Sequence, residues 1–298
     1  MGVDSAVLDV VIVSYNSRDC LRRAASEVAE YSRAHVIVVD NDSHDDSLET
    51  VSDLAITTIG LRRNGGFAHG CNVGMRIGVA PYVLFLNPDA TIDPASLAAL
   101  VACLDSDPEI GAVGPRILDD DGSLALTQRL FPRTLTVLAQ AFFLHRLPSG
   151  WTWTDDVVRD PALYERERSV EWLSGACILL RRDVLEQLGG LDEGFFHYCE
   201  DMDLCRRIRD LGCDIRYVPA ATAVHVGGHS APRTSLLPRL MASKLRYAEK
   251  HRGTIGRSSE RFALATYALT HAAVPTSAAA RHGHRRALMV NLRGGIPE

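Results

Sequence analysis

The chain has 298 residues, 46% hydrophobic and 23% charged, which is enough apolar material for one large domain or two closely fused domains. No apolar stretch approaches the ~18 residues that span a bilayer, and no basic segment followed by an apolar run marks a signal peptide. Seven scattered cysteines without a Cys-x-x-Cys pair argue against a disulfide or zinc framework and favour free thiols in a reducing cytoplasm.

The net charge of −5 is unevenly distributed along the sequence. Residues 239–298 contain eleven Lys or Arg and three acidic residues, which gives +8 and leaves about −13 for residues 1–238. A basic C-terminal region on an acidic body indicates a negatively charged partner, either anionic lipid headgroups or nucleic acid. A solvated helical face is the structural alternative.

The first apolar runs predict a βαβ unit. Residues 9–15 are typical of a buried strand, residues 17–32 of a helix, and residues 36–40 of a second strand that ends on polar residues. This order requires parallel strands joined by a right-handed crossover. The polar residues Ser14 to Asn16 and Asp40 are therefore expected at one edge of the sheet.

Residues 64–74, Asn-Gly-Gly-Phe-Ala-His-Gly-Cys-Asn-Val-Gly, form a glycine-rich loop that is expected to open a helix to about Val79. Small residues let the backbone approach a phosphate, and the N-terminus of a helix attracts anions. The loop does not follow the first strand, which disfavours a nicotinamide dinucleotide site. A glycine-rich turn without a ligand is the alternative.

A short apolar strand at residues 83–86 leads into Asn87-Pro88-Asp89. Pro88 cannot donate to a sheet ladder, so the strand is expected to end at Asn87. Asp89 then lies at the carboxyl end of a central strand, which is where open α/β sheets bind ligands. A lone carboxylate holds a divalent cation only if other groups and a substrate's phosphates complete the coordination. A solvated turn carboxylate is the alternative.

The middle of the chain is less regular. Residues 93–104 predict a helix and residues 110–114 a further strand. Periodicity fades between residues 119 and 168, which fits either a mobile flap over a site or a loosely patterned core. Pattern returns at residues 172–182, which predict a strand before a short helix at residues 183–188.

A helix is predicted from about Glu200 to Gly212, because its apolar residues share one face and glycine is a common C-cap. Glu200, Asp201 and Asp203 crowd its first turn. The helix dipole alone accounts for such acids, at ~0.3 to 1 kcal/mol each. The aromatic run at residues 195–198 favours a pocket instead.

Two further strands are predicted at residues 214–219 and 222–226, and two helices at residues 237–252 and 259–273. The residues after Pro275 are expected to form a loose basic tail. His225 and His229 flank a Val-Gly-Gly sequence after the second of these strands. A histidine pair at this spacing fits metal ligands, phosphate contacts or surface residues.

Seven short motifs occur in the order found in family-2 inverting glycosyltransferases. They are residues 11–16, 39–43, 64–74, 86–90, 172–176 and 200–204, and His225. The set is especially similar to the bacterial rhamnosyltransferases, including actinobacterial enzymes that add rhamnose to a lipid-linked cell-wall precursor. The resemblance covers residues 9 to about 230.

The resemblance implies an α/β fold of the GT-A type: a Rossmann-like, mostly parallel central sheet flanked by helices, with a C-terminal helical extension. The catalytic domain is expected over residues 1–230. Its nucleotide-binding half covers about 1–115 and its acceptor and catalytic half about 116–230, before a basic helical extension over 231–298.

The same resemblance implies where the donor binds. Ser14, Tyr15 and Asn16 would hold the ribose and base, and Asp40 would accept a hydrogen bond from the base imide nitrogen. The loop residues Asn64, Gly66 and Asn72 would lie near the diphosphate or donor sugar.

The resemblance also implies a metal site and a catalytic base. Asp89 is the surviving acid of the family's Asp-x-Asp motif, here with Asn87 as a poorer ligand, and it would hold Mg²⁺ or Mn²⁺ together with His225. Asp201 matches the catalytic base, with Glu200 as the alternative.

The motif of residues 172–176 implies the donor-sugar and acceptor side, and Arg207 beyond the motifs is a further candidate there. Trp172 would line the acceptor, and Ser174, Gly175 and Ala176 the donor sugar. Arg207 would orient or pair with Asp201, unless it is a surface arginine.

The implied function is inverting transfer of a sugar, L-rhamnose from dTDP-L-rhamnose in first place, to a hydroxyl of a lipid-linked or saccharide acceptor. A peripheral location at the inner face of the plasma membrane would suit the basic C-terminal region, and no nucleic acid is expected. The alternatives are a transferase that uses a UDP- or GDP-sugar, a catalytically silent nucleotide-sugar binding scaffold and, least favoured, a dinucleotide-dependent oxidoreductase.

Overall fold

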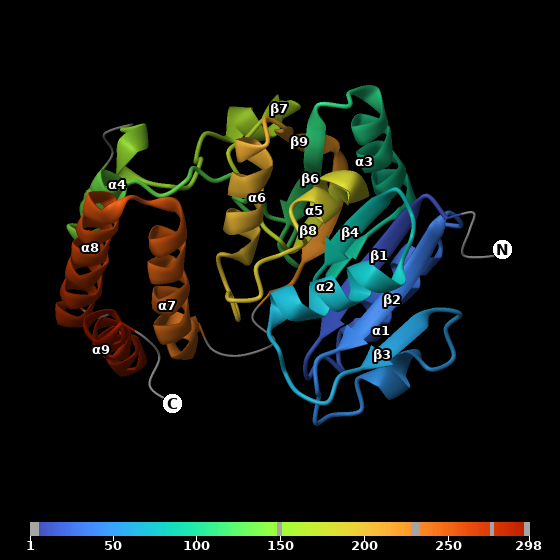
Figure 1. Ribbon diagram of the computed structural model, residues 1–298, viewed down its shortest axis with the longest axis horizontal. Coiled ribbons are helices and arrows are strands. Elements are labelled where there is room, and N and C mark those ends of the chain that lie inside the picture. The colour runs from blue at the N-terminus through green and yellow to red at the C-terminus, as the bar shows by residue number, and fades with distance from the viewer. Residues whose placement is uncertain (1–5, 148–150, 228–232, 275–276, 295–298) are drawn as a thin grey trace. The chain divides into compact units, whose positions relative to one another are not determined.

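The structure is a computed structural model that describes residues 6–147, 151–227, 233–274 and 277–294 (Figure 1). The chain divides into two compact units. One is built from Met1–Arg129, Arg159–Gly194 and Glu200–Ser230, and the other from Leu130–Val158, Phe195–Cys199 and Ala231–Glu298. Each unit has a hydrophobic core of its own.

The first unit is organised around a mixed sheet. Its strands are β1 (Leu8–Ser14), β2 (Ala34–Asp40), β3 (Thr57–Gly60), β4 (Tyr82–Leu86), β5 (Ala90–Ile92), β6 (Ile110–Leu118), β7 (Arg168–Ser169), β8 (Cys177–Arg181) and β9 (Asp214–His225). Their order is β3-β2-β1-β4-β8-β6-β9-β5, with β7 paired to β9. The ladders among β1 to β4 and between β6 and β9 are parallel, whereas β8 runs antiparallel to both of its neighbours.

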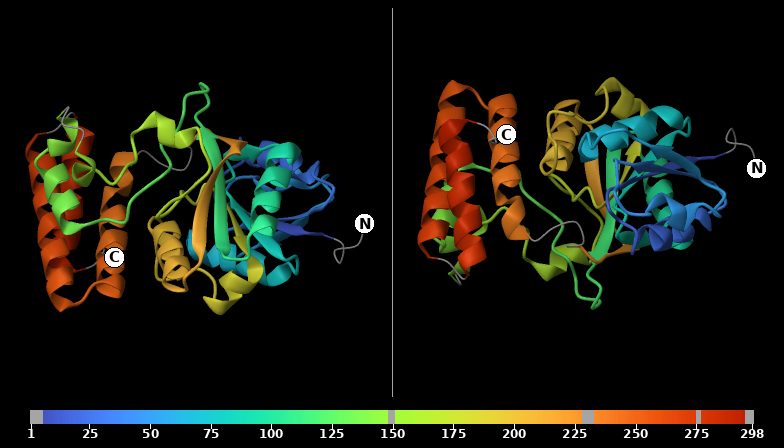
Figure 2. Two further views of the ribbon diagram at one scale, coloured as in Figure 1. Left: turned by 90° about the horizontal axis from the view of Figure 1, so that it is seen from above. Right: turned by 90° about the horizontal axis from the view of Figure 1, so that it is seen from below.

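Helices cover both faces of this sheet (Figure 2). The helices of the first unit are α1 (Leu21–Ala29), α2 (Phe67–Ile77), α3 (Pro94–Ser106), α5 (Arg182–Gln187) and α6 (Glu200–Asp210), with short 3₁₀ turns η2 (Leu48–Val51) and η5 (Pro161–Tyr164). Alternate residues of β1 pack in one core with α1 and α3. On the other face, a Cβ atom at Gly70 or Gly74 would lie 2.6 or 2.3 Å from the nearest side-chain atom of Val13 or Val11. These glycines let α2 lie directly on β1.

Several predicted elements have different bounds in the structure. The strand predicted at residues 172–182 is limited to β8, and the edge strand β3 is not predicted by the sequence because it is short and only alternately half-buried. The two strands predicted at 214–219 and 222–226 are one strand, β9. Its pairing with β6 shifts register across Pro219, since a bulge accommodates a residue that cannot donate to the ladder.

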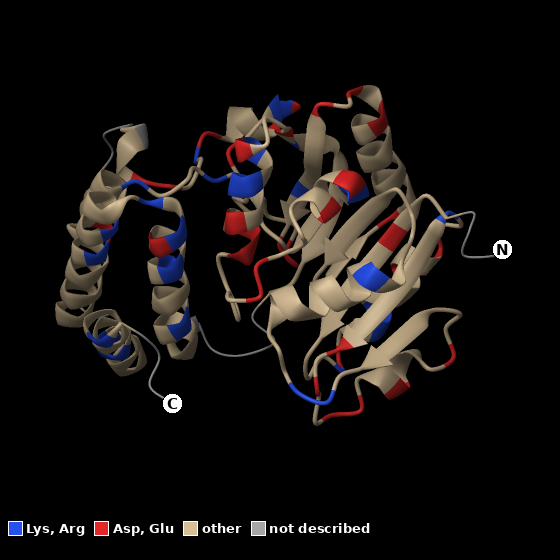
Figure 3. Cartoon of the chain, in the orientation of Figure 1, with Lys and Arg blue, Asp and Glu red and all other residues tan. Residues whose placement is uncertain are grey.

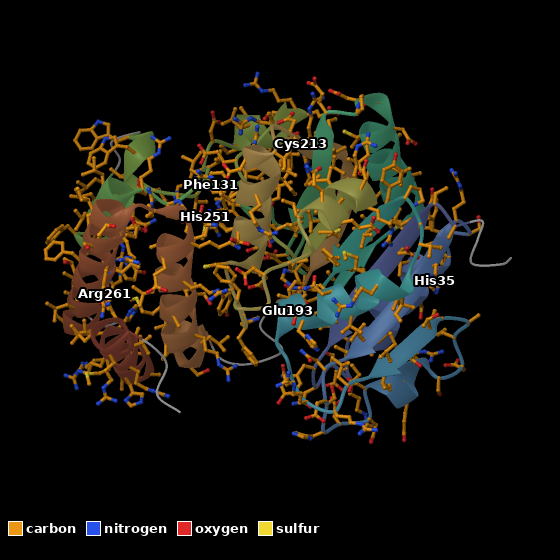
Figure 4. The ribbon with its side chains drawn as sticks, viewed as in Figure 1. His35, Phe131, Glu193, Cys213, His251 and Arg261 are labelled. Atoms are coloured by element: carbon orange, nitrogen blue, oxygen red, sulfur yellow. The ribbon has the colours of Figure 1, made fainter. Side chains whose placement is uncertain are left out.

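A buried charge network fastens the amino end of β1, at the edge opposite the strand ends that carry the predicted site. Asp9 is fully buried. Its Oδ2 accepts hydrogen bonds from the Ala80 amide at 2.7 Å and Arg182 Nη2 at 2.6 Å, and its Oδ1 lies 3.0 Å from His35 Nδ1 (Figure 4). The network ties β1 to β2, to the chain before β4 and to α5.

The second unit is helical. It contains α4 (Thr134–Ala141), α7 (Arg233–His251), α8 (Thr254–Ala273) and α9 (Ala278–Arg293), with 3₁₀ turns η3 (Leu144–Arg146) and η4 (Thr152–Thr154). The prediction of a loose tail after Pro275 is wrong for residues 278–293, because this alanine-rich segment forms α9 and buries Ala287 and Val290. Within the described ranges, every helix is too short or too polar to cross a membrane.

Candidate active site

The carboxyl ends of β2, β1 and β4 lie side by side, as the βαβ prediction requires. The parallel registers pair Ser14 with Asp40, and Ile12 with Leu86. The segment around Ser14, the Asp40 carboxylate and the Asn87-Pro88-Asp89 turn therefore follow neighbouring strands at one edge of the sheet.

A cluster of hydrogen-bonded polar residues forms where β1 and β2 end. The two carboxylate oxygens of Asp40 accept hydrogen bonds from the Ser43 hydroxyl at 2.6 Å and the Ser43 amide at 2.9 Å. The Asn16 amide donates to the same hydroxyl at 2.8 Å. Ser14 Oγ is buried without a hydrogen-bond partner among the described residues, whereas Tyr15 is exposed. An unpartnered buried hydroxyl is uncommon and marks a place where a bound molecule can complete the hydrogen bonding.

The glycine-rich loop is held against the end of β2. Asn41 accepts from the Gly65 amide and donates to the Gly66 carbonyl, both at 3.0 Å, and Asn64 Oδ1 accepts from the Gly66 amide. Gly66 has φ of +89°, a conformation that favours glycine. The loop thereby presents the N-terminus of α2, which is a favourable place for an anion.

Asn72 has a different structural role from the one implied by its motif. Its buried amide accepts from the Leu191 amide and donates to the Leu191 carbonyl and to Glu193, each at 2.9 Å. Glu193 also lies 2.8 Å from His69 Nδ1 at the start of α2 (Figure 4). Asn72 therefore fixes the loop of residues 188–194, and its direct contact with the donor stays a prediction.

Arg207 holds the other side of the same loop. It donates to Asp203 Oδ2 at 2.8 Å, one helical turn earlier, and to the carbonyls of Leu188 and Gly190. These bonds give its guanidinium a structural partner in Asp203, whereas the sequence suggested Asp201. The loop is thus clamped between α2 and α6.

The structure brings together the two predicted metal ligands, although 136 positions separate them in the sequence. The antiparallel pairing of β5 with β9 sets Ala90 opposite His225, and the Val226 amide donates to the Asp89 carbonyl. His225 Nε2 lies 3.1 Å from Asp89 Oδ1 and 3.2 Å from the side-chain amide of Asn87. His229, which the sequence pattern left as one alternative second histidine, lies outside the described residues.

These three side chains fit a divalent cation. A carboxylate, an imidazole nitrogen and an amide, whose O and N atoms are interchangeable by a flip, supply the O and N ligands that Mg²⁺ and Mn²⁺ accept. Among the described residues there is no group of three or more His, Cys, Asp or Glu side chains that could bind a metal alone. A cation here would therefore need further ligands from a bound molecule such as a diphosphate.

The segment of Ser174 to Ala176 connects this turn to the predicted base. The Asn87 amide donates to the Ala176 carbonyl at 2.9 Å. The adjacent Gly175 amide donates to Asp201 Oδ2, also at 2.9 Å, and a Cβ atom at Gly175 would lie 3.1 Å from the Cβ of Asp201. We name Ser174, Gly175 and Ala176 the bridging segment.

Asp201 and Glu200 begin α6, and three of its four acidic residues lie in its first turn (Figure 3). Burial raises the pKa of Asp201, while hydrogen bonds from the Gly175 and Met202 amides and the charge of Arg129 act in the opposite direction. Burial and the neighbouring Asp201 raise the pKa of Glu200 to about 8, and its Oε2 has no hydrogen-bond partner among the described residues. With a pKa of about 8, Glu200 keeps its proton at neutral pH.

Arg129 is a site residue that sequence reasoning missed. Its guanidinium carbon lies 5.9 Å from the centre of the Trp172 ring, and the two backbones exchange hydrogen bonds of 3.2 and 3.4 Å. Arg129 thus places a positive charge beside Trp172 and near Asp201. It lies in the poorly patterned stretch between residues 119 and 168, where no local signal marks it.

Glu200→Gln is expected to change how stability depends on pH. Glu200 has an ordinary pKa of 4.5 in the unfolded chain and a pKa of about 8 in the folded protein. Between pH 4.5 and about 8, the folded protein therefore holds this proton while the unfolded chain releases it. Its stabilising contribution is complete below pH 4.5 and is lost as pH rises through about 8. The neutral amide does not titrate and so removes this loss. The free energy of unfolding of the variant, relative to wild type, should therefore rise with pH and be the larger of the two at about pH 9.

Urea denaturation at about pH 5, 7 and 9 measures this difference. The exposed Glu30→Gln serves as the control and should follow the wild type. A constant difference between Glu200→Gln and wild type across the range would contradict the raised pKa.

The fold is that of the GT-A glycosyltransferases, as predicted. A mannosyltransferase from Pyrobaculum calidifontis, solved with GDP-Man and Mn²⁺, aligns with a TM-score of 0.60 at 17% identity, covering 96% of this chain and 87% of its own. GalNAc-T7, solved with UDP, GalNAc and Mn²⁺, aligns with a TM-score of 0.61 at 15% identity, covering 97% and 56%.

Residues 9–189 match the model of glycosyl transferase family 2. N-acetylglucosaminyl-diphospho-decaprenol L-rhamnosyltransferase of Mycobacterium tuberculosis is 31% identical over 265 residues, which cover 83% of this chain and 86% of that protein. Rhamnosyltransferase WbbL of Escherichia coli K12 is 27% identical over 237 residues, covering 74% and 83%. The chain belongs to glycosyl transferase family 2.

Proposed function

We propose that this glycosyltransferase moves L-rhamnose from dTDP-L-rhamnose to a hydroxyl of a lipid-linked or polysaccharide acceptor, with inversion at the anomeric carbon. The arrangement of Asp201 carries the proposal: a partly accessible carboxylate of raised pKa, held at 2.9 Å by the amide of Gly175. The similarity to two rhamnosyltransferases, one of which is named for a diphospho-decaprenol acceptor, supports the choice of sugar and acceptor class.

The donor would bind along the carboxyl edge of the sheet. The base and ribose would contact Ser14, Tyr15 and Asn16, and Asp40 keeps lone pairs that can accept from the base imide nitrogen. The diphosphate would meet the N-terminus of α2 beyond Gly66. Asn72 and Arg207 would act indirectly, because both hold the loop of residues 188–194.

Asp201 would accept the proton of the acceptor hydroxyl as that oxygen attacks the anomeric carbon and the bond to the diphosphate oxygen breaks. A single displacement from the opposite face inverts the configuration. A carboxylate whose pKa is raised by burial is a stronger base than one in water, and general base help contributes about 10² to 10⁴ in rate. Trp172 would wall the acceptor side, with Arg129 beside it.

Asp89 and His225, with Asn87 as a weaker ligand, would hold Mg²⁺ or Mn²⁺. The cation, when bound, supplies positive charge that stabilises the departing diphosphate. Two solved structures with this fold were determined with Mn²⁺, which supports a divalent metal at this site. The basic C-terminal region would bring the enzyme to an anionic membrane surface, where a lipid-linked acceptor resides.

Calorimetric binding of dTDP, UDP and GDP tests the proposal, first with Mn²⁺ and then with EDTA. We expect dTDP to bind most tightly and EDTA to weaken its binding, because Asp89 and His225 need the phosphates to complete the metal coordination. Asp89→Ala should bind dTDP equally weakly with and without Mn²⁺, whereas Asp120→Ala, which removes an exposed turn carboxylate, should match the wild type.

Each other outcome rejects a defined part of the proposal. If the protein prefers UDP or GDP, dTDP-rhamnose is rejected as the donor, while the fold and the proposed catalytic base Asp201 are unaffected. No binding of any nucleotide would favour a catalytically silent protein. A metal effect that survives in Asp89→Ala would remove Asp89 from the metal site.

A further inference from the structure

Helix α8 has apolar residues on two opposite faces. Toward the interior of the second unit it buries Ala263, Leu264 and Ala268, where it packs against α4, α7 and α9. Yet Ile255, Phe262 and Leu269 are 87%, 67% and 58% exposed. A helix on the surface of a protein in water normally carries polar and charged residues on its outer face. The outer face of α8 therefore needs an explanation.

The three exposed residues form one stripe. They are spaced seven residues apart, and a helix drifts only about 20° per seven residues, so all three lie within about 40° of arc. The stripe runs about 21 Å along the helix, directly opposite the buried face. The other residues on this outer half are small or hydroxylated: Thr254, Ser258, Ser259, Ala265, Thr266, Ala272 and Ala273. We name Ile255, Phe262 and Leu269 the α8 stripe.

The exposed charges carried by α8 and α9 have one sign, although the exposed Glu249 of α7 lines a pocket together with Arg257, Ser258 and Arg261 of α8. Residues 254–294 contain six arginines and one acid, Glu260, which gives +5 with histidines neutral. Glu260 is buried, where it accepts a hydrogen bond from Thr134 at 2.9 Å and pairs with Arg252 at 3.7 Å. Figure 3 shows basic residues and no acidic residue on α9. The exposed charge of this helix pair is thus entirely positive.

Helix α9 combines these arginines with apolar residues. Arg281 and Arg285 are exposed together with Met289 and Leu292, which are 41% and 62% exposed. Arg261 of α8, marked in Figure 4, donates to the carbonyls of Asn291 and Leu292 and so joins α8 to the end of α9. Exposed apolar residues mixed with arginines are typical of helices that lie in a lipid headgroup layer.

Exposed aromatic residues occur in the same unit. Phe142, after α4, is 60% exposed, and Trp151 and Trp153 are 54% and 47% exposed, with ring centroids 5.8 Å apart. Helix α4 packs against α8. Tryptophan is enriched where protein meets the membrane interface, since its ring is apolar and its N–H is polar.

We propose that the α8 stripe docks on an anionic phospholipid bilayer, with α8 lying in the plane of the interface and the arginines of α8 and α9 contacting lipid phosphates. Apolar burial and headgroup attraction then act together, as for other interfacial helices. The inference rests on the proposed lipid-linked acceptor for its biological sense, and it specifies which surface meets the membrane.

Flotation with lipid vesicles tests the docking surface. Wild-type protein should float with vesicles that contain about 25% phosphatidylglycerol at about 50 mM salt, and much less with pure phosphatidylcholine or at about 500 mM salt. The triple variant Ile255→Ser, Phe262→Ser, Leu269→Ser should lose about tenfold or more in vesicle affinity, because it lacks the apolar side chains that would enter the bilayer. Arg281→Gln with Arg285→Gln should weaken binding and flatten its salt dependence.

A matched control uses exposed apolar residues of the first unit. Ile77→Ser with Val79→Ser removes side chains that are 48% and 64% exposed and should leave flotation unchanged. The proposal would be overturned if wild-type protein bound neither the phosphatidylglycerol vesicles nor the phosphatidylcholine vesicles, or if the triple variant floated like wild type. A dimer in sedimentation that dissociates in the triple variant, without vesicle binding, would assign the stripe to a second copy of the chain.

Nucleotide binding without vesicles separates this inference from the proposed function. Retained dTDP binding with no flotation rejects only the docking surface. Flotation without any nucleotide binding rejects only the transferase proposal. The triple variant should bind dTDP as wild type does, which also shows that it is folded.

Discussion

Asp201→Asn is expected to lower the rate constant of sugar transfer by about 10² to 10⁴ while nucleotide binding stays unchanged. The amide keeps the shape of the carboxylate, and its oxygen, placed where Asp201 Oδ2 lies, can still accept from the Gly175 amide, so the first turn of α6 should keep its structure. An amide cannot take the proton of the acceptor hydroxyl. The loss should therefore fall on the chemical step, measured with dTDP-rhamnose in single-turnover experiments and by calorimetry with dTDP.

Two other variants on the same helix make this result specific. Asp210→Asn changes an exposed carboxylate that pairs with Arg206 at the far end of α6, and it should transfer sugar as wild type does. Glu200→Gln keeps the protonated form that Glu200 has at neutral pH, and it should retain most activity. Full transfer by Asp201→Asn together with loss in Glu200→Gln would move the role of base to Glu200.

Asp9→Ala is expected to lower the free energy of unfolding by about 3 to 5 kcal/mol. The side chains of Asp9 and Arg182 are 0% and 12% exposed, so removal of the carboxylate leaves a nearly buried guanidinium with only the exposed Glu186, at 3.7 Å, as a carboxylate neighbour. The Ala80 amide loses its acceptor at the same time. Urea denaturation measures the loss. The candidate active site lies at the other end of β1.

A surface pair provides the comparison for this prediction. Asp53 pairs with Arg22 at 2.6 Å, but both side chains are more than half exposed, so Asp53→Ala should change stability little. The double variant Asp9→Ala, Arg182→Met should recover part of the lost stability, because it also removes the charge of the nearly buried Arg182 guanidinium. Equal effects of Asp9→Ala and Asp53→Ala would contradict a buried network at the amino end of β1.

The carboxyl edge of the sheet could be predicted from the sequence because its signals are local. Continuous apolar runs that stop at Ser14, Asp40 and Asn87 identify strands buried on both faces, and parallel strands place their ends at one edge. The start of α6 at Glu200 follows from helical periodicity and its acidic first turn.

What could not be predicted depends on tertiary pairing. Only the ladder between β5 and β9 brings His225 to Asp89, and the motif resemblance, not the spacing, named this pair. Nothing near Arg129 in the sequence indicates its contact with Trp172. The amide of Asn72 and the guanidinium of Arg207 bind loop backbone that lies 119 and 17 residues away, respectively, so their structural partners are invisible to a local reading.

The α9 helix shows the limit of composition as a guide. Small and basic residues after Pro275 resemble a solvated tail, yet alanine is the best helix former and needs little space at a helix contact. A Cβ atom at Gly283 would lie 2.3 Å from the Thr234 carbonyl oxygen. The helix therefore packs directly on the start of α7, a contact that no single segment encodes.

The bridging segment joins the two ends of the candidate active site. Its Ala176 carbonyl holds the turn that carries Asp89, and its Gly175 amide, one residue earlier, holds Asp201. If the proposed donor pulled on the first of these bonds, it would change the free energy of placing the proposed acceptor against the second. Such linkage is reciprocal. The factor by which bound donor changes the affinity for acceptor must equal the factor by which bound acceptor changes the affinity for donor. Inert substitutions elsewhere would leave that factor intact, whereas Gly175→Ala, which crowds Asp201, would alter it in both directions at once.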